Sequence, residues 1–188
     1  MHMLFRTILH AWISRFGAPV GHYDVVSTRF RVLPTDLDIL WHMNNGVYLS
    51  IFDIGRFDML RRNGVWDVFR ERGWYPVIAS ETITFRKSLQ LWQRFEVESR
   101  IIGFDAKAVY VQQRAVVGGA TGSPGEIYAE GFIKARFLKR GGGTVSVDEL
   151  LDAMGAAPDR VHLPEWLVRW GDDVKLPATR ADAPSTWE

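Results

Sequence analysis

The side chains with the greatest potential for chemistry lie in one short segment, residues 34–49, which reads PTDLDILWHMNNGVYL. Its Asp38 carboxylate can act as a nucleophile or a general base, and His42 can donate or accept a proton near neutral pH. Asn44 and Asn45 follow directly behind this pair. A carboxylate, an imidazole and two amides so close together favour chemistry on a carbonyl group.

This segment lies between an expected strand and an expected helix. Residues 23–33 alternate apolar and polar side chains, as a half-buried strand does, whereas residues 47–62 are apolar around most of a helical axis. The N–H groups at a helix start carry a partial positive charge and can stabilise an oxyanion. The junction therefore predicts a site where amides polarise a carbonyl beside a carboxylate.

Composition excludes several kinds of site. The chain has 188 residues, no Cys and a formal net charge of +1. The lack of Cys removes thiol catalysis and Cys-ligated zinc, and the near-neutral charge does not favour binding to nucleic acid. The five His residues include no pair at ligand spacing, so we expect neither a metal nor a cofactor. Without Cys and without an apolar run long enough to span a membrane, the chain is expected to be cytoplasmic.

The first residues form a feature of their own. Residues 3–16 fit an amphipathic helix, and Arg6, His10 and Arg15 interrupt its apolar positions, which argues against a signal peptide. Such a helix either packs on the domain or on a partner subunit, or lies in a membrane interface. Packing is the expected arrangement, and any contact with a membrane would come from this segment alone.

The remaining elements follow from periodicity and capping. Alternation predicts strands over residues 77–86, 94–104, 108–117 and 127–138. Helices are expected over residues 65–71, 147–154 and 164–170, with Ser146 capping the second of them.

Within the central helix, Gly55 predicts that another part of the chain approaches the backbone closely. Asp53 with Arg56, and Asp58 with Arg61 or Arg62, have the spacing of ion pairs on a helix surface.

These elements predict an α+β fold in which an antiparallel sheet wraps around one long central helix. The strands should form a meander with one buried and one exposed face. We divide the chain into an N-terminal helix (residues 1–22), the main domain (23–140), and a C-terminal helix with an extended tail (141–188). A half-wrapped helix leaves a sheet edge and an open face, which favours dimers.

The pattern Asp36-x-Asp38-x-x-x-His42-x-Asn44-Asn45-x-x-Tyr48 resembles hotdog-fold acyl-CoA thioesterases of the 4-hydroxybenzoyl-CoA thioesterase type. The resemblance implies hydrolysis of an acyl-CoA thioester to a free acid and CoA, in lipid metabolism. It also implies a homodimer or a dimer of dimers, with the substrate pocket between subunits. This chain differs from many relatives in having Leu40-Trp41 where they have Gly or another small residue before the His.

The same resemblance implies roles for individual residues. Asp38 matches the second Asp of the D-x-D pair, which is the catalytic carboxylate of that family. It would attack the thioester directly or activate a water, while amides near residues 45–48 polarise the carbonyl. His42 either transfers protons or holds the turn, and Asp36 supports the turn.

Substrate-binding residues are expected at the helix start, at Asn44, Asn45, Gly46, Val47 and Tyr48. The two Asn residues would cap the helix, and Gly46 would let the carbonyl oxygen reach the backbone. Aromatic and aliphatic side chains of the central helix would line either a tunnel for a long chain or a slot for an aryl ring.

Two other functions fit the same residues. Asp38 and His42 could form the acid–base pair of a hotdog hydratase or dehydratase. The chain could also be a non-catalytic module that binds acyl-CoA or a fatty acid.

Overall fold

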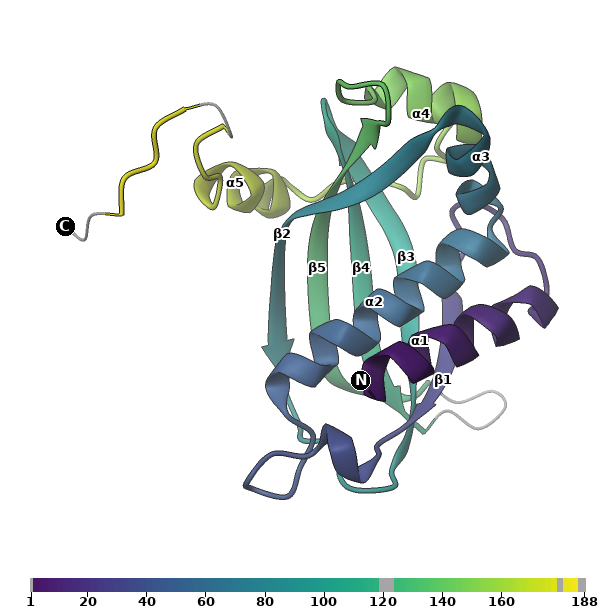
Figure 1. The fold of residues 1–188 in the computed structure, drawn as a ribbon, viewed down its shortest axis with the longest axis vertical. Helices are drawn as coiled ribbons and strands as arrows, with labels where there is room; N and C mark the ends of the chain where they lie inside the picture. Colours follow the sequence, from purple (N-terminus) through teal and green to yellow (C-terminus); the bar gives the residue numbers. More distant parts are fainter. Residues whose placement is uncertain (1, 119–123, 179–180, 186–188) are drawn as a thin grey trace.

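A five-stranded antiparallel sheet curls around one long helix, α2 (Figure 1). The computed structural model describes residues 2–118, 124–178 and 181–185. The strands are β1 (Val26–Arg31), β2 (Trp74–Phe85), β3 (Arg94–Asp105), β4 (Ala108–Val117) and β5 (Glu126–Lys139). The helices are α1 (His2–Ile13), α2 (Asn45–Arg62), α3 (Val65–Arg72), α4 (Val147–Met154) and α5 (Glu165–Asp173). The expected α+β architecture is confirmed.

The strand order is β1-β3-β4-β5-β2, and every neighbouring pair is antiparallel. Strands β3, β4 and β5 form a meander as expected, whereas β2, which was expected to belong to it, pairs with β5 at one edge of the sheet, and β1 forms the other edge. Helices α1 and α2 lie side by side over one face of the sheet (Figure 1), and His10 of α1 stacks on Phe30 of β1. This arrangement leaves the loop before α2 at one end of the molecule.

Helix α2 is buried on most sides, as its apolar pattern predicts. Its closest approach to the sheet is at Gly55, where a Cβ atom would lie 2.8 Å from Cγ1 of Val97 on β3. The expected close approach at this glycine is thus confirmed. The expected ion pairs Asp53–Arg56 and Asp58–Arg62 both form, but they do not lie on the helix surface, because Arg56 and Asp58 are buried.

Those two charged residues of α2 are paired inside the protein. Arg56 pairs with Asp53 and also donates to Oε1 of Gln113 on β4 at 2.6 Å. Asp58 accepts from Thr28 Oγ1 at 2.6 Å and forms an ion pair with Arg62 at 3.6 Å. The spacing of two charged residues along a helix does not tell whether they lie on its exposed surface or on a side that other elements cover.

The sheet does not have one exposed face, which corrects the expectation. Strand β4 is buried at nearly every position, on both faces. Helix α5 packs on the outer face, where Leu167 is fully buried with Ile102, Ala108 and Tyr110. Where α5 does not cover it, this outer face of the sheet is polar. The C-terminal segment is thus packed on the sheet at α5.

Strand β2 forms one edge of the sheet along its 12 residues. Several of its apolar side chains remain partly exposed, with fractions near 40% for Tyr75, Val77 and Ile78. An edge strand presents backbone N–H and C=O groups that another strand can bind.

Candidate functional site

Residues 36–44 form a closed loop immediately before α2. The Asn44 N–H donates to the Asp36 carbonyl at 2.8 Å, and the Asp38 N–H donates to the His42 carbonyl at 3.0 Å. The loop turns at Trp41, which has a φ of 62°. Left-handed backbone favours glycine, so Trp41 holds a conformation that few side chains adopt.

Asp38 and His42 face each other across this loop. One carboxylate oxygen of Asp38 lies 3.5 Å from Nδ1 of His42, and the other accepts from the Leu40 N–H at 2.8 Å. Both side chains are partly shielded, with exposed fractions of 22% and 29%. Nδ1 of His42 is enclosed and has no partner at hydrogen-bond distance. The geometry gives an oriented carboxylate beside an imidazole.

Asp36 lies in the protein interior, at the base of the loop. Its carboxylate accepts from Nη1 of Arg6 on α1 at 2.7 Å and from the Leu33 N–H at 2.8 Å. These contacts fasten the loop to α1 and to the end of β1. The sequence gives no local signal for Arg6 as a partner, because 30 residues separate it from Asp36.

The start of α2 lies directly behind this loop. Asn44 is the N-cap, and its Oδ1 accepts from the Gly46 N–H at 2.8 Å. Asn45 and Gly46 are exposed and Val47 is half-buried, so a substrate can approach the first turn from solvent. The helix begins two residues earlier than its apolar pattern predicts, because the Asn44 cap extends it.

Tyr48 points into the core and away from the first turn. It is fully buried, stacks edge-on against Phe85 at 5.1 Å, and accepts from the Leu89 N–H at 3.1 Å. Burial raises the pKa of the Tyr48 hydroxyl above its usual value. The structure therefore places this residue in the packing behind the site.

The strand-like segment that includes Leu89 and Gln90 supports the loop from below. The Met43 N–H donates to the Leu89 carbonyl at 2.9 Å, and His42 forms an isolated bridge with Gln90. Nothing in the local sequence pattern marked these two residues as part of the site.

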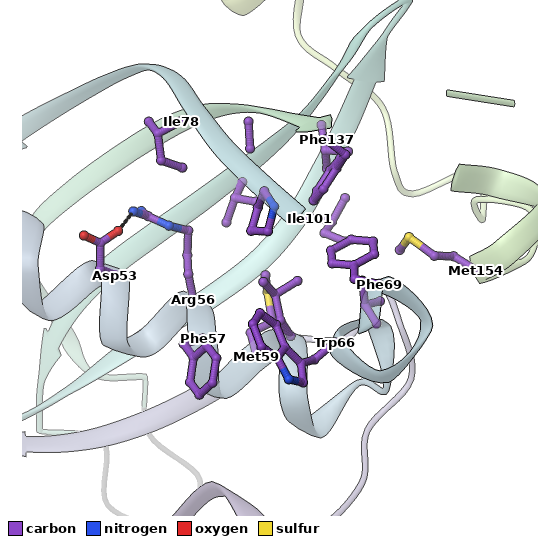
Figure 2. A pocket seen from close by; sticks show the side chains of 16 residues that line it. Asp53, Arg56, Phe57, Met59, Trp66, Phe69, Ile78, Ile101, Phe137 and Met154 are labelled. Carbon is purple, nitrogen blue, oxygen red and sulfur yellow. Dashed lines mark hydrogen bonds and ion pairs between the residues drawn. The ribbon is translucent and has the colours of Figure 1, made fainter. Parts of the chain in front are cut away.

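An apolar cavity of about 220 Å³ lies further along α2 (Figure 2). It is enclosed by the second half of α2, by α3 and by the concave face of the sheet. Phe57, Trp66, Phe69 and Phe137 contribute aromatic walls, and the Asp53–Arg56 pair lies at one side. Asp38 and His42 do not line it. The expectation of an apolar acyl site named only the central helix, whereas α3 and the strands supply much of this wall.

Two general findings concern the described part of the chain. Among those residues, no group of three or more His, Asp or Glu side chains is arranged to hold a metal ion. None of the helices found there has the length and apolarity needed to cross a bilayer.

Comparison with known proteins gives a consistent picture. The family described as the thioesterase-like superfamily matches residues 32–171. Protein THEM6 of Xenopus laevis is 46% identical over 85 residues, which make up 45% of this chain and 41% of the frog protein. The chain spans about half the length, or less, of the frog and zebrafish proteins of that name.

Solved structures share the fold. The probable thioesterase YbaW of Escherichia coli superimposes with a TM-score of 0.62 at 18% identity, covering 72% of this chain and 98% of YbaW. The DHNA-CoA thioesterase of Staphylococcus aureus gives a TM-score of 0.55 at 12% identity, covering 71% of this chain and 97% of that enzyme. Likeness at such low identity concerns the fold alone.

Proposed function

The chain belongs to the thioesterase-like superfamily and has the hotdog fold, and from this premise we propose that it hydrolyses acyl-CoA thioesters to a free acid and CoA. The observation that carries the proposal is the Asp38–His42 pair, held 3.5 Å apart in a closed loop at the start of α2. Two solved structures that share this fold are named as CoA thioesterases, the gentisyl-coenzyme A thioesterase and the DHNA-CoA thioesterase. They support CoA as the carrier.

In this proposal the thioester carbonyl lies at the first turn of α2. Asn45 and Gly46 are exposed there, and the Gly46 and Val47 N–H groups already donate to Asn44. The developing negative charge on the carbonyl oxygen is therefore stabilised by the Asn45 N–H and by the positive end of the helix dipole. Asp38 attacks the carbonyl carbon or takes a proton from the attacking water.

The loop contacts fix the orientation of the reactive groups. The Leu40 N–H holds one oxygen of Asp38, which leaves the other facing His42. His42 can then pass a proton to the departing CoA thiolate. Asp36 and Asn44 act as positioning residues, because they close the loop and cap the helix.

The acyl group is proposed to run along α2 toward the apolar cavity. From Asn45 to Asp53 the helix rises about 12 Å, so an aryl group held at the first turn does not reach the cavity. A long aliphatic chain does reach it and buries apolar surface there. We therefore propose long-chain acyl-CoA as the substrate class.

The test is Asp38→Asn, which keeps the shape of the side chain and removes its charge. We expect kcat/KM on the best substrate of an aryl, short-chain and long-chain CoA ester panel to fall by about a hundredfold or more. Asp67→Asn, the same change at an exposed position on α3, is the matched control and should leave kcat/KM unchanged.

Equal activity of Asp38→Asn and the wild type would remove Asp38 from the mechanism. Within the panel, long-chain esters should be the best substrates. Equal kcat/KM for acetyl and long-chain esters would contradict the proposed use of the cavity, but not the proposed role of Asp38. The hydratase alternative uses the same Asp38–His42 pair. Water addition to an enoyl-CoA, without thioester cleavage, would favour it over hydrolysis.

A further inference from the structure

Helix α1 carries its apolar side chains on the outside. Leu4, Phe5, Ile8, Leu9 and Trp12 are each more than half exposed. The 3₁₀ turn that follows, Ser14–Phe16, adds the exposed ring of Phe16 to the same segment. We call this set of six side chains the α1 apolar face. A helix packed on a globular domain normally turns such a face inward.

The inner side of α1 is polar and holds the helix in this orientation. Arg6 is buried in its ion pair with Asp36 and also donates to the Arg31 carbonyl at 2.7 Å. Eight residues later, Ser14 donates to the buried carboxylate of Asp58 on α2. Turning the α1 apolar face inward would break all three contacts and leave charged groups buried without their partners.

We propose that the α1 apolar face docks this protein on a phospholipid bilayer. The helix would lie in the plane of the membrane interface, with its apolar side chains entering the boundary between headgroups and acyl chains. The proposal concerns where the protein works and does not depend on the reaction that it catalyses.

Two further observations favour a lipid surface. The first 23 residues contain no Asp or Glu, so this end of the chain does not repel anionic headgroups, and Arg15 is exposed beside the face. The exposed set includes Trp12 together with two Phe rings, and aromatic side chains are common at the depth of the headgroups.

The size and chemistry of the face argue against a protein partner. Twelve helical residues give a strip of about 18 Å by about 10 Å, which is far below the ~800 Å² that each partner of a stable interface usually contributes. Protein interfaces also contain roughly one hydrogen bond per 100–200 Å². The six side chains of the face offer a single polar hydrogen, the indole N–H of Trp12. A bilayer needs neither a large area nor matching polar groups.

The experiment measures flotation of the full chain with vesicles of phosphatidylcholine, and with vesicles of phosphatidylcholine mixed with phosphatidylserine. The wild type should float with both, about fivefold more tightly with the mixed vesicles for one basic side chain near the surface. Phe5→Ser combined with Trp12→Ser should weaken binding by about tenfold or more, because two exposed rings leave the interface. Both side chains are exposed, so the fold should persist; a melting curve checks this.

The matched control is Val174→Ser combined with Leu176→Ser, which removes two exposed apolar side chains from the C-terminal tail. This variant should float like the wild type. Trp12→Phe supplies a second readout: it should still bind, yet lose most of the additional quenching that brominated lipid chains produce in the wild type.

Three results would overturn the proposal. They are a wild type that binds neither kind of vesicle, a tail variant that loses as much binding as the α1 variant, and equal quenching by brominated lipid in the wild type and in Trp12→Phe. Oligomers that require the α1 apolar face, in place of flotation, would instead identify the face as a contact between protein chains.

Discussion

Gly55 marks the point where the central helix leaves no space for a side chain. In an exposed helix, Gly→Ala raises stability by about 1 kcal/mol. At this position the new methyl carbon would lie 2.8 Å from Cγ1 of Val97, a branched side chain on the sheet, so the contact must relax. Overpacking of this kind costs about 1–3 kcal/mol, which outweighs the gain in helix propensity.

We therefore expect Gly55→Ala to lower the free energy of unfolding by about 1 kcal/mol, measured by urea denaturation. In a Val97→Ala background the clashing atom is absent, and the same substitution should raise stability. A stabilising effect of Gly55→Ala in the wild-type background would show that the sheet yields at this point.

For individual residues, the sequence predicted which reactive side chains the loop contains better than it predicted the contacts that these side chains make. The spacing of Asp38 and His42 identified the two groups that the structure brings face to face, since the three residues between them fold into one turn. It did not predict the buried pairing of Asp36 with Arg6, because a long-range ion pair leaves no periodic trace. The catalytic role of Asp38 remains a prediction.

Among the elements, α1 and the loop before α2 are held together by a buried ion pair. The joint is the Arg6–Asp36 ion pair, whose side chains are 8% and 0% exposed. Removing one partner of a buried pair leaves the other charge in a poorly solvated place.

Arg6→Met should therefore destabilise the protein by about 3 kcal/mol and increase hydrogen exchange in both α1 and residues 36–44. Arg15→Met changes an exposed Arg of the same segment and should shift stability by less than about 0.5 kcal/mol. If exchange rises in α1 while the loop stays protected, the two elements are independent.

Element positions were predictable where the sequence alternates or carries a helix cap. The expected strand over residues 108–117 and helix over residues 147–154 have the same bounds in the structure, because alternation and a Ser146 cap define them. The orientation of α1 was not predictable, because an amphipathic pattern fixes which residues share a face and leaves open which way that face points. The buried outer side of β4 depends on α5, which follows 47 residues later in the chain.

For the whole molecule, we expect the sheet edge at β2 to direct how copies associate. The strand offers 12 residues of backbone and partly exposed apolar side chains, so we expect two copies to pair their β2 strands. Light scattering after size exclusion should give twice the chain mass at micromolar concentration.

Tyr75→Lys combined with Val77→Lys should halve that mass, because charged side chains on an edge strand oppose pairing. Val25→Lys places one positive charge before β1, at the opposite edge of the sheet, and the protein with this substitution should remain dimeric. A wild type that is monomeric throughout this concentration range would contradict the prediction.

Helix α5 has a consequence for how large such an assembly can grow. With Leu167 it covers an apolar part of the sheet's outer face. Elsewhere on the sheet, hydrogen bonds link the polar side chains of Arg100, Gln112, Glu130 and Arg114. Packing two sheets together by their outer faces would require displacing α5 and desolvating these hydrogen-bonded side chains. We therefore expect copies to associate through their β2 edges as pairs, without packing the outer faces of their sheets together.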